Sequence, residues 1–181
     1  MFTFDLRRLL RQAGGQPIVV SLLILDASHS MQQHGRTPEI VVNRHLDTLR
    51  GDTTTYHITG LVTFSDNYNV EIPLMPIRQV PRYTGYRADG QTLLWRTVKR
   101  ALQGLHDAWN RLSPSEKARI RIVVATMSDG DDNKSPRSDY PSALQEWSRA
   151  TRDHGWELLT FGIGINGRQL ARDMGFSEAL A

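Results

Sequence analysis

An apolar run that ends abruptly on oxygen-bearing side chains is the feature that most constrains the fold of this chain. Residues Ile18–Leu25 read IVVSLLIL and are followed at once by Asp26. A short run rich in β-branched residues is typical of a strand that is buried on both faces, as in the centre of a parallel sheet. It is far shorter than the about 20 residues that a helix needs to span a bilayer. The run therefore predicts a central strand of an α/β domain and no membrane span.

The rest of the sequence alternates between strand-like and helix-like segments. Apolar residues at helical spacing, or helix-start and helix-end signals, predict helices over residues 2–12, 37–50, 92–112, 141–154 and 167–174. Short apolar or β-branched runs predict further strands over residues 56–64, 68–74, 119–126 and 156–162. Strands that alternate with helices form a mostly parallel sheet with helices on both faces.

One pair of strands departs from this alternation. Only Ser65-Asp66-Asn67 separates the strand 56–64 from the strand 68–74, which indicates an antiparallel hairpin. Pro73 in the second strand indicates a position at the edge of the sheet, because proline cannot donate to a neighbouring strand. The predicted fold class is therefore α/β: a doubly wound, mostly parallel sheet with one antiparallel edge strand. We expect an N-terminal helical extension over residues 1–16 and a single domain over residues 17–181.

Composition and charge exclude several classes of function. The 181 residues include no Cys, which removes disulfides, thiolate metal sites and a Cys nucleophile. The formal net charge of +3 is too small to indicate nucleic-acid binding by itself. Arg7, Arg8 and Arg11 before the apolar run imitate a signal peptide, but cleavage after the run would remove or split the cluster Asp26–Ser30. We expect a cytoplasmic protein that binds no nucleic acid.

Side chains that carry oxygen stand after two of the predicted strands and at the start of one predicted helix. Asp26, Ser28 and Ser30 come directly after the strand 18–25, Asp129 follows the strand 119–126, and Thr92 begins a helix. Folds of this class bind ligands at the carboxyl ends of their strands, where these loops can converge. Carboxylates and hydroxyls suit a hard cation, so we expect Mg²⁺, with Mn²⁺ or Ca²⁺ as alternatives.

The spacing of these residues indicates which of them would bind the ion directly and which would orient the others. In an extended turn, side chains two residues apart point the same way, so Ser28 and Ser30 can hold one ion together. Asp26, beside the strand end, can hold water or orient the two serines. Two carboxylates balance the charge of a divalent ion, while neutral oxygens leave it electrophilic. Such an ion keeps a position open for a carboxylate from another protein.

The combination of Asp26-x-Ser28-x-Ser30, Thr92 and Asp129-Gly130 resembles the metal-ion-dependent adhesion site of the von Willebrand factor A-type (vWA) domain family. The resemblance covers roughly residues 17–174. It implies that Ser28 and Ser30 bind Mg²⁺ directly, that Thr92 and Asp129 exchange between direct and water-mediated contact, and that Asp26 acts mainly through water. It also implies a protein partner that supplies Asp or Glu. The chain is most similar to bacterial stand-alone members, so an ATPase or a stress-response protein is a candidate partner.

Several features leave alternatives open. His29 stands where this family usually has Gly, and it is either a solvent-facing side chain or a residue at the rim that contacts the partner. Asp131 and Asp132 are either a solvated acidic stretch or a source of extra charge near the ion. The glycines in Gly162–Gly167 match a dinucleotide-binding pattern, but no βαβ unit or suitably placed acidic residue follows, so we expect turn glycines.

The loop before Thr92 is rich in residues that suit an interface. Its arginines and those of the following helix would steer an acidic partner if they surrounded the metal, although a solvated surface is an equal alternative. Tyr83 and Tyr86 are candidate interface anchors. The arginines concerned are Arg78, Arg82, Arg87, Arg96 and Arg100.

These observations predict a binding module rather than an enzyme. Its function would be to capture an acidic side chain of a partner protein through the metal site. The alternative is a Mg²⁺-dependent phosphohydrolase or phosphotransferase with Asp26 as nucleophile. Against this alternative, no carboxylate stands two residues after Asp26 and no well-placed Lys is present for phosphate charge. A scaffold without metal binding is the third hypothesis.

Overall fold

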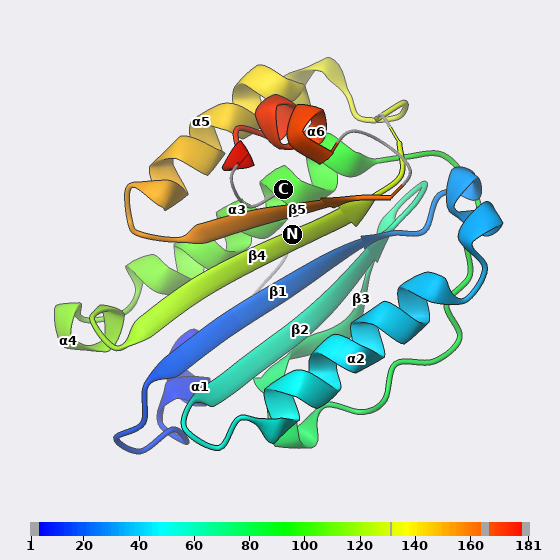
Figure 1. Cartoon of the computed structure of the whole chain (residues 1–181). Helices are drawn as coiled ribbons and strands as arrows, with labels where there is room; N and C mark the ends of the chain where they lie inside the picture. Colours follow the sequence, from blue (N-terminus) through cyan, green and yellow to red (C-terminus); the bar gives the residue numbers. More distant parts are fainter. Residues whose placement is uncertain (1–3, 131, 164–166, 179–181) are drawn as a thin grey trace.

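One five-stranded sheet organises the chain. The computed structural model describes residues 4–130, 132–163 and 167–178. The strands lie in the order β3-β2-β1-β4-β5 (Figure 1). Their bounds are β1 Ile18–Asp26, β2 Tyr56–Phe64, β3 Tyr68–Pro76, β4 Ile120–Ser128 and β5 Glu157–Gly162.

The pairing of the strands confirms the predicted topology. The central strand β1 runs parallel to β2 on one side and to β4 on the other, and β4 runs parallel to β5. β3 pairs antiparallel with β2 at one edge of the sheet. In this register Asp26 lies opposite Phe64, and Leu25 lies opposite Met127. The loops after β1, β2 and β4 therefore leave the sheet at the same edge.

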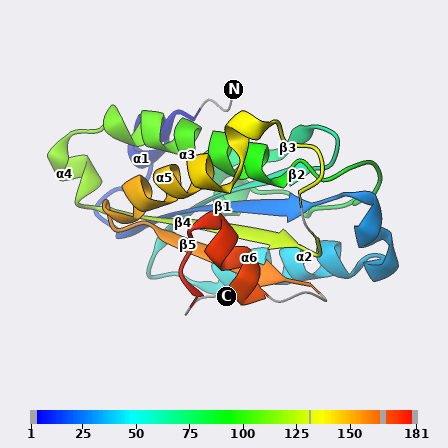
Figure 2. The ribbon, with the colours of Figure 1, turned by 90° about the horizontal axis from the view of Figure 1, so that it is seen from above.

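Helices cover both faces, as predicted, and Figure 2 shows α3 and α5 on one side of the sheet and α2 on the other. The short helix α4 was not predicted; it begins with a capping box in which Ser113 and Glu116 bond each other's backbone. The predicted helices are present with ends shifted by a few residues. Their bounds are α1 Leu6–Leu10, α2 Thr37–Gly51, α3 Leu94–Asn110, α4 Pro114–Lys117, α5 Pro141–Arg152 and α6 Gly167–Met174. No helix in the described part of the chain is both long enough and apolar enough to cross a bilayer.

The larger hydrophobic core lies between the sheet and α1, α3, α5 and α6. Strand alternation sends Val20, Leu22 and Ile24 of β1 into this core, where they are almost fully buried. Phe4 and Leu6 of the N-terminal segment belong to the same cluster. The N-terminal helix therefore packs on the core that the sheet also uses.

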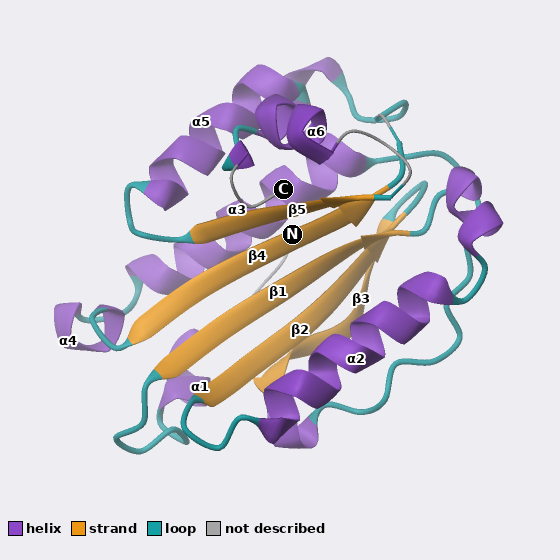
Figure 3. Cartoon of the chain, viewed as in Figure 1, coloured by secondary structure: helices purple, strands orange, loops and turns teal. Residues whose placement is uncertain are grey.

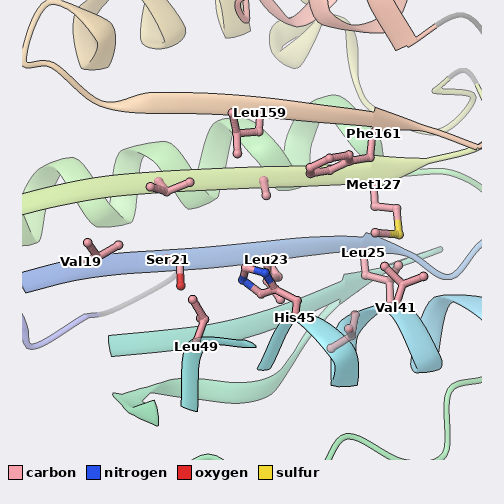
Figure 4. A pocket seen from close by; sticks show the side chains of 13 residues that line it. Val19, Ser21, Leu23, Leu25, Val41, His45, Leu49, Met127, Leu159 and Phe161 are labelled. Atoms are coloured by element: carbon pink, nitrogen blue, oxygen red, sulfur yellow. The ribbon is translucent and has the colours of Figure 1, made fainter. Parts of the chain in front are cut away.

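The opposite face of the sheet is covered less completely. A smaller core cluster includes Leu25 and Leu61 of the sheet and Val42 and Leu46 of α2. Figure 3 shows α2 in front of the sheet beside β2, whereas β4 and β5 have no helix in front of them in this view. An apolar groove of about 250 Å³ therefore lies on this face, between α2 and the strands β4 and β5 (Figure 4).

Candidate metal centre

Three loops are joined by backbone hydrogen bonds at the carboxyl ends of the parallel strands. The loop after β1 is held to the end of β2 by a bond of 2.7 Å from the amide of Ala27 to the carbonyl of Phe64. The same loop is held to the segment before α3, because the amide of Asp89 donates to Ala27 and the amide of His29 donates to Gly90. These bonds place the residues that follow β1 between the two other chain segments.

Three of the predicted ligands form a continuous chain of side-chain contacts. The hydroxyls of Ser28 and Ser30 share a hydrogen bond of 3.1 Å. The Ser30 hydroxyl also donates to Oδ1 of Asp129 at 2.8 Å. The structure therefore brings together Ser28 and Ser30 from the loop after β1 and Asp129 from the loop after β4.

The reason for the convergence of the two serines differs from the prediction. An extended turn was expected, but Ser28 precedes a 3₁₀ helix over His29–His34, and Ser30 lies in its first turn. The hydroxyls meet because the chain turns tightly between them, not because both project from one side of an extended segment. The prediction of an extended turn was wrong, although the side chains of Ser28 and Ser30 still point toward the same place and are hydrogen-bonded.

Asp26 is the most constrained residue of the cluster. Its carboxylate is completely buried, with Oδ1 accepting from the amide of Ser28 at 2.8 Å and Oδ2 accepting from the hydroxyl of Ser128. Burial raises the pKa of Asp26, hydrogen bonds from Ser128 and Ser28 oppose the rise, and the charge of Asp129 adds to it. This arrangement suits a residue that orients Ser28.

Sequence reasoning gave Ser128 no role, although the structure assigns it one. Leu25 pairs with Met127, so the next side chains along both strands, those of Asp26 and Ser128, point to the same face. The only signal in the sequence was a hydroxyl two residues after the predicted strand 119–126. A role for Ser128 can be inferred only when the register between β1 and β4 is known.

Asp129 faces polar side chains of the 3₁₀ helix. Its Oδ2 accepts from the side-chain Nε2 of Gln33 at 3.4 Å and lies 3.5 Å from Nε2 of His34. Within the described residues, neither Asp26 nor Asp129 forms an ion pair with Lys or Arg. Two carboxylates therefore share a site where the protein supplies little positive charge.

Thr92 is attached to the site through its backbone. It is buried, its amide donates to Oδ1 of Asn133 at 2.8 Å, and its carbonyl accepts from the amides of Asn133 and Lys134. These bonds hold the start of the α3 segment against the loop that contains Asp129. The structure thus places Thr92 beside that loop, whereas side-chain hydrogen bonds link the other predicted ligands.

The donor set and its spacing fit a small divalent cation. Octahedral ligands about 2.0–2.1 Å from Mg²⁺ are separated from their nearest neighbours by about 2.9 Å. The contacts Ser28–Ser30 and Ser30–Asp129, at 3.1 and 2.8 Å, lie close to this spacing. Among the described residues no group of three or more His, Cys, Asp or Glu side chains could hold a metal, so hydroxyl oxygens are essential to a site here.

Asp132 has a different role from those considered in the sequence. Asp132 caps the start of α3, because its Oδ2 accepts from the amide of Trp95 at 2.7 Å and its Oδ1 accepts from the amide of Ser135 at 2.7 Å. It is therefore not simply a solvated charge. Asp131 and Gly164 of the glycine motif lie outside the described residues.

The two tyrosines of the loop before Thr92 pack inward. Tyr83 is buried, and the side chain of Asn43 in α2 bonds to both its amide and its carbonyl. Tyr86 donates its hydroxyl to the carbonyl of Asp26 at 2.7 Å. The expectation that Tyr83 anchors an interface was wrong, because a side chain needed by the core is not available to a partner. Tyr86 supports the backbone of the site instead.

Two of the five arginines pair with carboxylates other than Asp26 and Asp129. Arg96 binds Asp139 at 2.9 Å beside α3, and Arg82 lies 3.9 Å from Asp47 of α2. These two are therefore directed to neighbouring carboxylates. His29 is exposed, and its backbone amide donates to the carbonyl of Gly90 at 3.0 Å.

A mostly parallel, doubly wound sheet with hydroxyls and carboxylates gathered at its carboxyl edge defines the class of this domain, an α/β domain whose loops bring polar side chains together. No protein-family model matches the sequence, and no curated protein matches it either. Solved structures do resemble it, and they identify the fold as the vWA fold.

Three solved structures show the extent of the likeness. The ArnB paralog VWA2 from Sulfolobus acidocaldarius has a TM-score of 0.58 and 14% identity, over 88% of this chain and 39% of its own. The pilus adhesin SpaC from Lactobacillus rhamnosus GG has a TM-score of 0.63 and 13% identity, over 92% and 28% of the two chains. Proximal thread matrix protein 1 from the mussel byssus has a TM-score of 0.55 and 17% identity, over 90% and 40%. This chain thus spans two fifths or less of the length of each.

Proposed function

We propose that this domain is a divalent-metal-dependent protein-binding module that captures an acidic side chain of a partner. The observation that carries the proposal is the chain of oxygens from Ser28 through Ser30 to Asp129, at 3.1 and 2.8 Å. Their spacing suits adjacent ligands of Mg²⁺, and Ser30 is exposed to solvent. Mn²⁺ and Ca²⁺ are the alternative ions.

Each residue would have a distinct part in this site. Ser28, Ser30 and Asp129 would hold the ion, and Thr92 would complete the set from the adjoining loop. Asp26 would orient Ser28, since its own oxygens accept from Ser28 and Ser128. The ion would supply a Lewis-acidic position for the carboxylate of a partner, and the scarcity of protein cations around Asp26 and Asp129 gives that ion a charge to neutralise.

The surroundings of Asp26 support binding rather than phosphoryl transfer. A nucleophilic carboxylate needs an oxygen that can reach the substrate. Asp26 is completely buried and both of its oxygens accept hydrogen bonds from the protein. We therefore favour a non-enzymatic role over the hypothesis of an aspartyl nucleophile.

The partner class follows from the chemistry of the site. A partner must present Asp or Glu, and a cytoplasmic ATPase or stress-response protein is the candidate suggested by the family resemblance. One similar structure is a pilus adhesin, which lends general support to a binding role for a domain of this fold.

The experiment measures the ion and the carboxylate separately. Titration calorimetry with Mg²⁺ should show binding to the wild type and at least tenfold weaker binding to Ser28→Ala and Asp129→Ala. Ser138→Ala, at an exposed residue of the short 3₁₀ turn Arg137–Asp139, is the matched control and should bind Mg²⁺ like the wild type.

Capture of a carboxylate is then tested with immobilised Glu-containing peptides and their Gln counterparts. Retention of the chain should require both Glu and Mg²⁺, and EDTA should remove it. Equal retention in EDTA, or equal retention on the Gln peptides, contradicts the proposal.

A further inference from the structure

A polar pocket of about 270 Å³ lies at the end of the sheet opposite the metal centre. Three stretches of chain line it: the segment that follows α1, the segment from the end of α2 to the start of β2, and the end of β3 with the 3₁₀ turn Ile77–Gln79. Figure 1 shows α1 at the end of the sheet where β1 and β2 begin.

The length of β2 separates this pocket from the metal centre. Tyr56, the first residue of β2, lines the pocket, whereas Phe64 at the other end of β2 lies opposite Asp26. The strand rises about 3.3 Å per residue, so positions 56 and 64 are about 26 Å apart. A ligand in the pocket therefore does not touch the residues proposed to hold the ion.

The lining of the pocket favours a polar ligand with negative charge. Pro76 and Ile77 are the apolar residues of the lining, and the others carry hydroxyl, amide, imidazole or charged groups. In the described part of the chain the charged residues that line it are Arg50, Arg78 and Asp52. Two guanidinium groups therefore stand against one carboxylate.

The carboxylate of Asp52 is engaged by the protein on both of its oxygens. Oδ1 accepts from the amide of Thr54 at 2.9 Å and from the hydroxyl of Thr54 at 2.6 Å, and Oδ2 lies 2.8 Å from Nε2 of the buried His57. Hydrogen bonds from Thr54, and then the one from His57, hold the pKa of Asp52 well below its usual range. Asp52 thus stays ionised and fixes the wall of the pocket.

Two other groups of the lining have donors that the protein does not use. Within the described residues, the Arg78 guanidinium forms no hydrogen bond or ion pair and the Tyr56 hydroxyl forms no hydrogen bond. Burial raises the pKa of Tyr56 and the charge of Arg78 opposes the rise, so the two groups lie near each other. Arg50 differs, because it donates to Asp47 at 2.6 Å and to the carbonyl of Val80 at 2.8 Å.

These two donors suit one oxyanion. A guanidinium presents a planar fork that matches two oxygens of a carboxylate or a phosphate, and hydrogen bonds to a charged oxygen are about twice as strong as neutral ones. A phenol hydroxyl can donate to the same group. Arg78 and Tyr56 therefore form the part of the pocket that recognises charge.

The remaining polar groups suit the uncharged body of the ligand. The side-chain amides of Gln12 and Gln79 line the pocket and form no hydrogen bonds within the described residues. An amide both donates and accepts, which fits a hydroxyl. The volume corresponds to about nine water molecules at 30 Å³ each and lies below the usual range for drug-sized ligands. The body therefore has only a few carbon atoms.

We propose that this pocket binds a small polyhydroxylated anion, either a phosphate ester or a carboxylate. Arg78 and Tyr56 hold its charged group, and Gln12 and Gln79 bind its hydroxyls. The ligand joins the N-terminal segment to the strands β2 and β3, so it stabilises the folded chain. Its binding needs no ion and goes beyond the function proposed above.

The test is titration calorimetry with defined probes in a phosphate-free buffer of fixed ionic strength, from which a resin has removed divalent ions. Glycerol 3-phosphate and glucose 6-phosphate represent the phosphate esters, glycerate and gluconate represent the carboxylates, and glycerol and glucose are the neutral counterparts. At least one anionic probe should bind the wild type at least tenfold more tightly than its neutral counterpart, and its class identifies the anion. If every anionic probe binds no better than its neutral counterpart, the proposal is overturned.

Matched variants locate the binding site. Arg78→Ala and Tyr56→Phe should each weaken the binding of that probe about tenfold, since each removes a charge-assisted hydrogen bond. Arg44→Ala is the control, because Arg44 is also exposed and without an ion pair in the described part of the chain, but lies outside the pocket. Circular dichroism checks that all three variants are folded. Equal affinity in Arg78→Ala and Arg44→Ala overturns the proposal.

Thermal unfolding gives a second readout. A saturating concentration of the probe should raise the melting temperature of the wild type and of Arg44→Ala, but not that of Arg78→Ala. The same rise in Arg78→Ala places the anion elsewhere on the chain and overturns the proposal.

Discussion

Two serine hydroxyls at this site donate hydrogen bonds to buried carboxylates: Ser128 to Asp26, and Ser30 to Asp129. The Ser128 hydroxyl is the clearest case, since it donates to an oxygen of the completely buried Asp26. A buried acceptor that loses its donor bears the full cost of desolvation, which is about 1–3 kcal/mol. Ser128 should therefore affect both the stability of the fold and the position of Ser28.

Ser128→Ala should lower the free energy of unfolding by about 1–3 kcal/mol in urea denaturation. It should also weaken Mg²⁺ binding, because Asp26 would then be oriented by one hydrogen bond fewer. Ser138→Ala, whose residue is exposed, is the control in both measurements. A variant as stable as the wild type would show that Asp26 does not depend on this bond.

A second residue-scale effect arises far from the metal centre. His106 of α3 stacks on His154 with ring centroids 5.4 Å apart, and His154 packs at 4.2 Å on Trp109. Burial, and then the charge of His154, lower the pKa of His106 below its usual 6.5. The folded protein thus favours the neutral imidazole.

The pH dependence follows from this direction. Above pH 6.5 both the folded and the unfolded chain hold His106 neutral; as the pH falls below 6.5, the unfolded chain takes up the proton first, so stability is lost. The melting temperature should be lower at pH 5.5 than at pH 7.5, and His106→Gln should reduce the difference. Ser138→Ala, at an exposed residue that does not titrate, should leave it unchanged. An unaltered pH dependence in His106→Gln would contradict the assignment.

At the scale of elements, the start of α3 depends on a loop that follows β4. Helix α3 has no side-chain cap at its own Leu93. Asp132 supplies the acceptor instead, binding the amide of Trp95, while Ser135 accepts from the amide of Arg96. The cap also ties the Thr92 segment to the loop of Asp129. Asp132 therefore contributes both to the stability of α3 and to the position of Thr92 beside the loop of Asp129.

Asp132→Ala should destabilise the fold by about 1–2 kcal/mol, the usual cost of a lost helix cap. It should also weaken Mg²⁺ binding, since Thr92 would be held less firmly. Glu146→Ala on the exposed face of α5 serves as the control for removal of a carboxylate. Urea denaturation and calorimetry measure the two effects, and loss of stability with unchanged Mg²⁺ affinity would separate the cap from the site.

For the whole molecule, the proposed ion should act as a stabilising ligand. An ion that binds only the folded chain adds about 2.7 kcal/mol at a concentration of 100 Kd. For a domain of this size such a gain raises the melting temperature by about 5–10 °C. Thermal unfolding with Mg²⁺ and with EDTA should show this shift in the wild type, and Ser28→Ala should abolish it. An identical shift in the variant would place the effect at another site.

Much of the architecture could be predicted because its signals are local. The apolar run 18–25 lies in the central strand, and the hairpin around Ser65–Asn67 places β3 at the edge. Asp26, Ser28, Ser30 and Asp129 stand out because polar residues interrupt apolar patterns at strand ends. Whether they bind a metal stays a prediction.

The sequence by itself determined the order along the chain of the strands and of the described helices other than α4, and most of the residues that gather at the carboxyl edge. Periodicity and turn chemistry act between near neighbours, so they can be read along the chain. Only the tertiary structure decided that Ser128 supports Asp26, that Asp132 caps α3 from another loop, and that α2 leaves β4 and β5 uncovered. Those contacts depend on strand register and on which face each helix covers. Both are set by packing between segments that lie far apart in the chain.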